Sequence, residues 1–118
     1  LVVEDEPAVL RLTTRMLSSL GYQVFGADNG EAALRVMEIE GPRIQCVVTD
    51  VLMPKMTGPR MVSLLRETHP ELPVVFMSGY VLEADGDLMG AVEDAPWFIP
   101  KPFTADQLAR TVRSALDA

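Results

Sequence analysis

The stretch CVVTDVLMP, residues 46–54, decides how the rest of the chain is interpreted. Its first four residues are apolar or β-branched, and the run stops at Asp50. Such a run is typical of a strand buried on both faces of a parallel sheet, and Pro54 cannot continue it. Asp50 is therefore predicted at the carboxyl end of a central strand. In open parallel sheets, that edge is where ligands bind.

Length and composition favour one globular domain over residues 1–118. Of these residues, 48% are hydrophobic and 23% are charged, as in ordinary soluble domains. The formal net charge of −7 argues against direct binding of nucleic acid. No apolar run has the length of a membrane span, so no membrane contact is expected. The single cysteine, Cys46, is interpreted as a buried, inert thiol, and a reducing, cytoplasmic location is predicted.

Strands and helices are predicted to alternate five times. Short apolar runs predict strands over 1–3, 22–25, 44–49, 73–77 and 97–99, the first of them truncated at its N-terminus. Helical spacing of apolar residues predicts helices over 7–20, 28–39, 58–68, 81–92 and 104–116, with Ile39 on an apolar face and Thr104 as a cap. This alternation with short connections predicts an α/β fold, a five-stranded parallel sheet with helices on both faces.

Polar residues follow four of these strands. They are Glu4 and Asp5 after the first strand, Asp50 after the third, Ser78 after the fourth and Lys101 after the fifth. Carboxyl ends of parallel strands share one edge, and with the strand order 2-1-3-4-5 the first and third strands are neighbours. The three carboxylates are then expected to converge in one crevice.

Three converging carboxylates repel each other unless cations neutralise them. Lys101 and one divalent cation would balance their charge, and oxygen ligands without paired His or Cys favour Mg²⁺ or Mn²⁺ over zinc. A carboxylate beside such a cation, with the Ser78 hydroxyl and the Lys101 ammonium nearby, is suited to accept a phosphoryl group. The expected product is an aspartyl phosphate at Asp50.

The sequence resembles the receiver domain of two-component response regulators. The resemblance implies the flavodoxin-like receiver fold with the strand order 2-1-3-4-5. Each matching segment is short, but together and in order they are specific and run nearly from end to end. They are VEDEP at 3–7, DVLMP at 50–54, Gly58, MSGY at 77–80 and KPF at 101–103.

The resemblance implies metal ligands and a phosphoacceptor. Asp50 would be the phosphoacceptor. Asp5 and Asp50 would bind Mg²⁺ directly, the main-chain carbonyl of Leu52 would complete the protein ligands, and Glu4 would act largely through water. An aspartate is commoner in the family at the position of Glu4.

The resemblance also implies a switch. Ser78 would be the switch hydroxyl, Lys101 the active-site lysine and Phe98 the aromatic switch residue, which acts sterically because it lacks a hydroxyl. Leu52 and Tyr80 occupy positions that influence dephosphorylation in the family. Because an apolar Leu52 cannot orient an attacking water, we hypothesise a long-lived phosphoryl group.

The implied partners are a sensor histidine kinase or phosphotransfer domain, which supplies a phosphohistidine, and a downstream output domain or protein. The domain itself is expected to be a monomer or a weak dimer. The segments 78–80 and 99–103 also resemble receivers attached to hybrid sensor histidine kinases, and the chain ends suggest a fragment of such a protein.

Two other functions fit the same sequence less well. A phosphatase with an aspartyl nucleophile usually has a second aspartate two residues later, where this chain has Leu52. A receiver-like scaffold would bind partners without phosphorylation, and the intact set of carboxylates argues against it.

Overall fold

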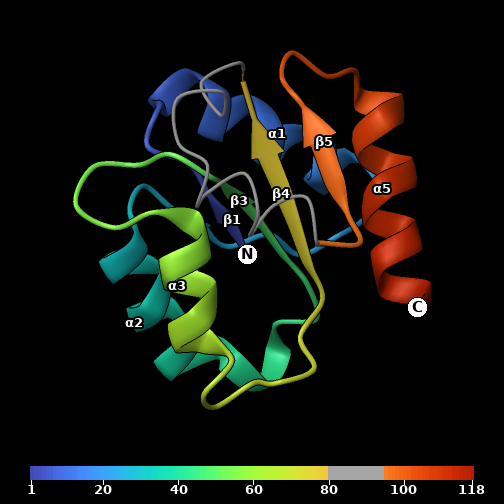
Figure 1. Cartoon of the computed structure of the whole chain (residues 1–118). Helices are drawn as coiled ribbons and strands as arrows, with labels where there is room; N and C mark the ends of the chain where they lie inside the picture. The colour runs from blue at the N-terminus through green and yellow to red at the C-terminus, as the bar shows by residue number, and fades with distance from the viewer. Residues whose placement is uncertain (80–94) are drawn as a thin grey trace.

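The structure is a computed structural model that describes residues 1–79 and 95–118, and its centre is a five-stranded parallel sheet (Figure 1). The sheet has the order β2-β1-β3-β4-β5, and every neighbouring pair is parallel. The predicted sheet and strand order are therefore confirmed. The strands are β1 (Val2–Val3), β2 (Gly26–Ala27), β3 (Val47–Asp50), β4 (Val74–Ser78) and β5 (Phe98–Pro100).

Helices cover both faces of this sheet (Figure 1). Residues of α2 and α3 pack in one buried hydrophobic cluster, and residues of α1 and α5 pack in a second one on the opposite face. The predicted helix over 81–92, and Tyr80, lie outside the described residues. The helices are α1 (Pro7–Ser19), α2 (Gly30–Glu40), the short 3-10 helix η1 (Gly41–Arg43), α3 (Gly58–Leu65) and α5 (Ala105–Asp117).

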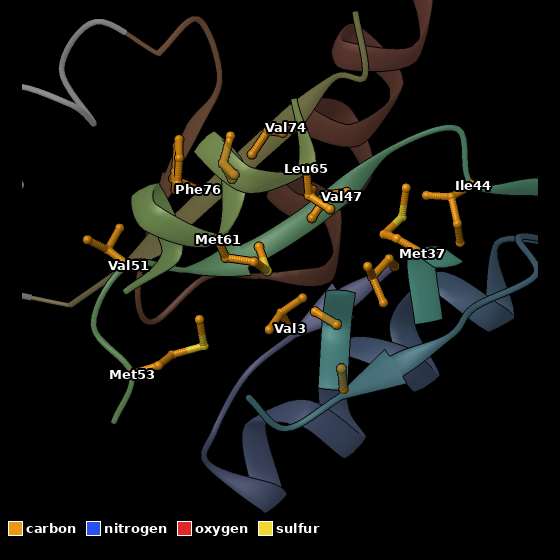
Figure 2. Packing of buried hydrophobic residues seen from close by; sticks show 14 residues of the cluster. Val3, Met37, Ile44, Val47, Val51, Met53, Met61, Leu65, Val74 and Phe76 are labelled. Atoms are coloured by element: carbon orange, nitrogen blue, oxygen red, sulfur yellow. The ribbon is translucent and has the colours of Figure 1, made fainter. Parts of the chain in front are cut away.

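Strand side chains alternate between the two clusters. In β3, Val47 belongs to the cluster under α2 and α3, whereas Val48 belongs to the one under α1 and α5. This alternation follows from the two-residue repeat of a strand. Figure 2 shows Val47 beside Met61 and Leu65 of α3. With apolar cover on both faces, β3 carries Asp50 at the end of a fully buried strand.

Side-chain caps explain where three helices begin. The side chain of Asn29 accepts a hydrogen bond from the amide of Ala32, and that of Thr57 accepts one from the amide of Arg60. Thr104 forms a capping box with Gln107 at the start of α5, which confirms the predicted cap. Each cap satisfies backbone donors that have no partner in the first helical turn.

The second strand differs from its predicted position at 22–25. The register pairs Val2 with Gly26 and Val3 with Ala27, and the amide of Val2 donates to the carbonyl of Phe25. Residues 22–24 therefore do not pair with β1. Tyr22 and Val24 pack instead against the cluster under α1 and α5.

Two features of the predicted helices also differ. Helix α3 ends at Leu65 rather than at residue 68, because the amide of Thr68 bonds the Leu65 carbonyl in a tighter turn. Ile39 was placed on an apolar face but is 76% exposed, because Ala33 and Met37 define the buried side of α2. Among the described helices, none is both long and apolar enough to cross a membrane.

Candidate metal and phosphoryl site

Three carboxylates meet at the carboxyl edge of the sheet. Glu4 and Asp5 follow β1, and Asp50 ends β3. One oxygen from each of the three lies within 4.8 Å of the others. These side chains come together because β1 and β3 are neighbours, with Val3 opposite Thr49. The edge therefore gathers negative charge from distant parts of the sequence.

Lys101, which follows β5, reaches across this edge to two of the carboxylates. Its Nζ donates to Glu4 Oε2 at 2.6 Å and to Asp50 Oδ2 at 3.1 Å. Because β4 lies between β5 and β3, the lysine side chain must extend over the end of β4. Its own backbone is held there, since the Lys101 amide donates to the Ser78 carbonyl at 2.8 Å.

The backbone after Asp50 is packed tightly against the phosphoacceptor candidate. The Val51 amide donates to Asp50 Oδ1 at 2.9 Å, and the amide of Gly58 donates to the Val51 carbonyl at 2.8 Å. A Cβ added at Gly58 would collide with the carbonyl oxygen of Asp50. Only glycine permits this close approach of α3 to the end of β3.

Burial and charge act differently on the two members of the Glu4–Lys101 ion pair. Burial raises the pKa of Glu4; the hydrogen bond from Lys101 opposes that rise, and the charge of Asp50 adds to it. Burial acts to lower the pKa of Lys101, but the hydrogen bond to Glu4 and the charges of Glu4 and Asp50 outweigh it and raise that pKa.

Burial wins at Glu4 because its side chain is 1% exposed, against 21% for that of Lys101. Lys101 therefore stays charged at neutral pH, and Glu4 holds its proton more strongly than an ordinary glutamate. Among the described residues, no buried side-chain nitrogen or oxygen lacks a hydrogen-bond partner. Lys101 thus bridges the two buried carboxylates, Glu4 and Asp50.

The donor set fits a hard divalent cation. Mg²⁺ prefers oxygen ligands, and one carboxylate oxygen from each of the three acids lies within 4.8 Å of the others. Glu4 is enclosed, and both its oxygens accept hydrogen bonds, from the Glu6 amide and from Lys101. Asp5 is the most accessible of the three acids. Asp5 and Asp50 are thus better placed than Glu4 to hold a cation directly.

Other predicted site residues lie close by on the same edge or on β5. Ser78 is buried, and its hydroxyl donates to the Gly79 carbonyl at 3.1 Å. Phe98 is 39% exposed on β5. Leu52 is partly buried against the cluster under α2 and α3. The structure thus brings the three acids together and joins Glu4 and Asp50 to Lys101, while the Ser78 hydroxyl donates to its neighbour's carbonyl and Phe98 is exposed.

Two site features were not predicted from the sequence. Lys101 was expected beside Asp50, but its shorter contact with Glu4 was not expected. The position of Gly58 against the Asp50 carbonyl was not expected either. The sequence signal for the Gly58 contact was weak, because a glycine at the start of a helix can have several explanations. The contact arises only because the chain turns after Asp50 and brings Gly58 back against the end of β3.

Relatives of the chain come from two-component signalling. The sensor kinase CckA of Brucella abortus is 45% identical over 99% of this chain, which covers 12% of that protein. The probable transcriptional regulator ycf27 of Cyanophora paradoxa is 34% identical over 98% of this chain, which covers 47% of it. The chain spans less than half the length of either relative.

Solved structures of similar fold are receiver domains. The receiver domain of NtrX from Brucella abortus matches with a TM-score of 0.85 and 30% identity, over 99% of this chain and 97% of that one. A response regulator receiver domain protein from Clostridium thermocellum matches with a TM-score of 0.86 and 26% identity, over 98% and 91% of the two chains. The family model described as response regulator receiver domain matches residues 1–113. This chain therefore belongs to the receiver domain family of two-component response regulators.

Proposed function

We propose that this receiver domain, residues 1–118, accepts a phosphoryl group on Asp50 in a Mg²⁺-dependent reaction. The observation that carries the proposal is the joint contact at the sheet edge. Asp50 lies within 4.8 Å of oxygens of Glu4 and Asp5 and 3.1 Å from the Lys101 ammonium. A carboxylate between a cation site and an ammonium group is arranged to receive a transferring anionic group.

The proposed metal ligands are Asp5, Asp50 and the main-chain carbonyl of Leu52, with Glu4 acting through a bound water. The enclosure of Glu4 and its two accepted hydrogen bonds support its indirect role. When bound, Mg²⁺, or Mn²⁺ in its place, would neutralise charge on the transferred phosphoryl oxygens.

The proposed reaction transfers phosphorus from nitrogen to oxygen. A carboxylate oxygen of Asp50 attacks the phosphorus of a phosphohistidine; the new O–P bond forms as the N–P bond breaks, and the imidazole keeps the electron pair and takes a proton from water. Lys101 is held by Glu4 at 2.6 Å and is close enough to Asp50 to contact a phosphoryl oxygen on it. Its pKa is raised, so it carries the required charge at neutral pH.

The proposed signal is a change in the β4–β5 region. Ser78 would turn its hydroxyl from the Gly79 carbonyl toward a phosphoryl oxygen, and Phe98 would leave its exposed position on β5. Ser78 ends β4, which pairs with β3 at Asp50, and Phe98 lies on β5, which pairs with β4. Phosphorylation would thereby shift the population between two packings of this face.

The proposed phosphodonor is a sensor histidine kinase or a phosphotransfer domain in the cytoplasm, and an output domain or protein receives the signal. The 45% identity to the sensor kinase CckA favours a hybrid histidine kinase as the parent protein. The domain itself is proposed to act as a monomer or a weak dimer. Leu52, in place of a polar residue, favours slow loss of the phosphoryl group and disfavours a phosphatase.

The test is phosphorylation by a small-molecule donor. The protein is incubated with acetyl phosphate and Mg²⁺, and intact mass is measured over time. We expect the mass gain of one phosphoryl group, which disappears when the metal is removed with EDTA. Asp50→Asn should give no adduct, whereas the exposed acid variant Asp28→Asn should be modified like the wild type.

Each alternative has its own outcome. Turnover of many donor molecules per protein, with little adduct, would favour a phosphatase. A wild-type protein that gains no mass at saturating donor and Mg²⁺ would favour a scaffold. Loss of the adduct within seconds would contradict the slow dephosphorylation expected from Leu52.

A further inference from the structure

The loop between β3 and α3 contains a strained turn. Lys55 has a φ of 70°, and the Met56 amide donates to the Pro54 carbonyl at 2.8 Å. A hydrogen bond from residue i to i−2 around a centre with positive φ is a rare and strained γ-turn. A non-glycine residue with such a φ persists only where surrounding contacts hold it.

The contact beside this turn is between Met56 and Gly30. A Cβ added at Gly30 would lie 2.6 Å from Met56 Sδ and 3.0 Å from both Met56 Cβ and Cγ. The Met56 side chain therefore lies directly over the Gly30 backbone, at the first residue of α2. It also packs against the hydrophobic cluster under α2 and α3.

Gly30 is not required for any other local reason. Its φ is not in the left-handed region, where Gly21 is the only glycine among the described residues. The cap of α2 comes from Asn29, whose side chain accepts from the Ala32 amide at 2.8 Å. The missing side chain at Gly30 thus serves the close approach of Met56.

This contact is adjacent to the acidic edge of the sheet. Asp5, Gly30, Lys55 and Met56 all line one hollow of about 340 Å³. The loop that carries Met56 begins after Asp50 and ends at Gly58, which packs on the Asp50 carbonyl. A shift of Met56 would therefore displace the loop backbone that follows Asp50 and the Gly58 backbone that packs on the Asp50 carbonyl.

We propose that Met56 is a positioning residue that packs on Gly30 and thereby holds the β3–α3 loop in the geometry that the cation site requires. The inference rests on the proposed function, since it concerns the same site. Met56 touches neither cation nor phosphoryl group. It acts by fixing the segment between Asp50 and Gly58, which includes the carbonyl of Leu52.

The test compares two variants that break the contact with one that does not. Gly30→Ala places a methyl group where Met56 lies; Sδ can swing away, but Met56 Cβ moves only with the loop backbone. Met56→Ala removes the packing side chain. Gly21→Ala is the matched control, because it strains a backbone with a φ of 95° and no atom lies within 4 Å of its new Cβ.

Mg²⁺ affinity is measured by calorimetry on folded protein, alongside thermal unfolding without metal. We expect Gly30→Ala and Met56→Ala each to weaken Mg²⁺ binding about tenfold, as is typical when support around a metal ligand is lost. Gly21→Ala should lower thermal stability yet leave the Mg²⁺ dissociation constant within about twofold of wild type. In the double variant Gly30→Ala/Met56→Ala, the alanine at 30 should add less loss than it causes alone, because the contacts with Met56 Sδ and Cγ are gone and only the one with Cβ remains.

A second measurement needs no metal. Hydrogen exchange of the Met56 and Gly58 amides should accelerate in Gly30→Ala and Met56→Ala but not in Gly21→Ala. Unchanged Mg²⁺ binding in both loop variants, an equal loss in Gly21→Ala, or additive losses in the double variant would each overturn the proposal. If wild-type protein binds no Mg²⁺, the proposed function fails and the metal part of this inference fails with it. Exchange rates then decide whether Met56 holds the loop.

Discussion

Cys46 and Asp50 lie at opposite ends of one apolar run, and their surroundings give them different chemistry. Burial raises the pKa of the Cys46 thiol to about 11, and its sulfur contacts the Val47 carbonyl. Cys46 is half-buried, whereas Asp50 is nearly enclosed, at 8% exposure, and receives a backbone amide and the Lys101 ammonium. Burial alone keeps a proton on the thiol, whereas burial among donors and a cation prepares a carboxylate for chemistry.

The two edges of the sheet repeat this contrast on a larger scale. The hollow near Cys46, about 170 Å³, is lined largely by apolar side chains that include Leu17 and Val112. The opposite edge holds the carboxylates of Glu4, Asp5 and Asp50. The same strands therefore present packing surface at one end and a charged site at the other.

Removing the Lys101 ammonium group should have the largest effect on the charged edge of the sheet. In Lys101→Met, we expect phosphorylation by acetyl phosphate to slow by about 100-fold, as when a donor to developing charge is lost. The variant should also unfold more easily at neutral pH, by about 3 kcal/mol, because enclosed Glu4 loses its charge partner. Phosphorylation rates by mass spectrometry and urea unfolding measure the two effects.

The control for this variant is Arg15→Met, which removes an exposed cation from α1. It should leave both quantities near wild type. Adding Glu4→Gln to Lys101→Met should restore part of the stability but none of the rate. Equal phosphorylation rates in Lys101→Met and Arg15→Met would show that the ion pair has no part in the reaction.

Crowding the backbone of Asp50 should have the next largest effect. In Gly58→Ala, the added methyl meets the Asp50 carbonyl, so the start of α3 or the end of β3 must move. We expect a loss of about 2 kcal/mol of unfolding free energy and a slower phosphorylation rate. Thermal unfolding and the acetyl phosphate assay check both. A wild-type rate at reduced stability would mean that the close approach matters only for folding.

The pH should tune the acidic edge more gently. The pKa of Glu4 is raised above its ordinary value of 4.5, so its proton competes with a cation in a window above pH 4.5. Mg²⁺ affinity should fall as the pH decreases through that window, by up to about tenfold per pH unit, and metal binding should release protons. Calorimetry in buffers of different ionisation enthalpy measures both.

The raised pKa of Glu4 also determines how the stability of the metal-free protein changes with pH. The folded protein prefers protonated Glu4, so this contribution is fully present below pH 4.5 and is lost as the pH rises through the raised pKa. Glu4→Gln should remove both pH dependences. A Mg²⁺ affinity that does not change with pH would separate Glu4 from the metal site.

Changes at Cys46 should have the smallest effect on phosphorylation and stability. With a pKa of about 11, the half-buried thiol should react with a disulfide reagent at pH 8 much more slowly than an exposed cysteine. Cys46→Ser should cost about 1 kcal/mol of stability and leave phosphorylation unchanged. Rapid labelling of the folded protein, measured by absorbance, would contradict the inert assignment.

Much of the fold follows from local sequence pattern. The run before Asp50 could be recognised because its apolar residues face two clusters at once, and Thr104 because its capping box with Gln107 is local. The meeting of Glu4, Asp5 and Asp50 followed from topology, since carboxyl ends of parallel strands share an edge.

What escaped prediction depends on contacts between distant elements. Where β2 begins and ends depends on its register with β1, and the sequence of residues 22–25 alone does not determine that register. Nothing about a lysine indicates the positive φ of Lys55, and the packing of Met56 on Gly30 joins a loop to the start of a helix far away in the sequence. The Lys101–Glu4 contact depends on how far a side chain reaches over β4. Such contacts leave no periodic pattern in the sequence from which they could be predicted.

The central claim is that acids from β1 and β3 share one divalent cation beside Asp50. Its most direct test is a crystal structure of the protein with Mn²⁺, in which anomalous scattering locates the ion. We expect one strong peak within bonding distance of both Asp5 and Asp50, with the Lys101 ammonium nearby and no peak there in Asp50→Asn crystals. A peak bound elsewhere, or none at this edge at saturating Mn²⁺, would contradict the account.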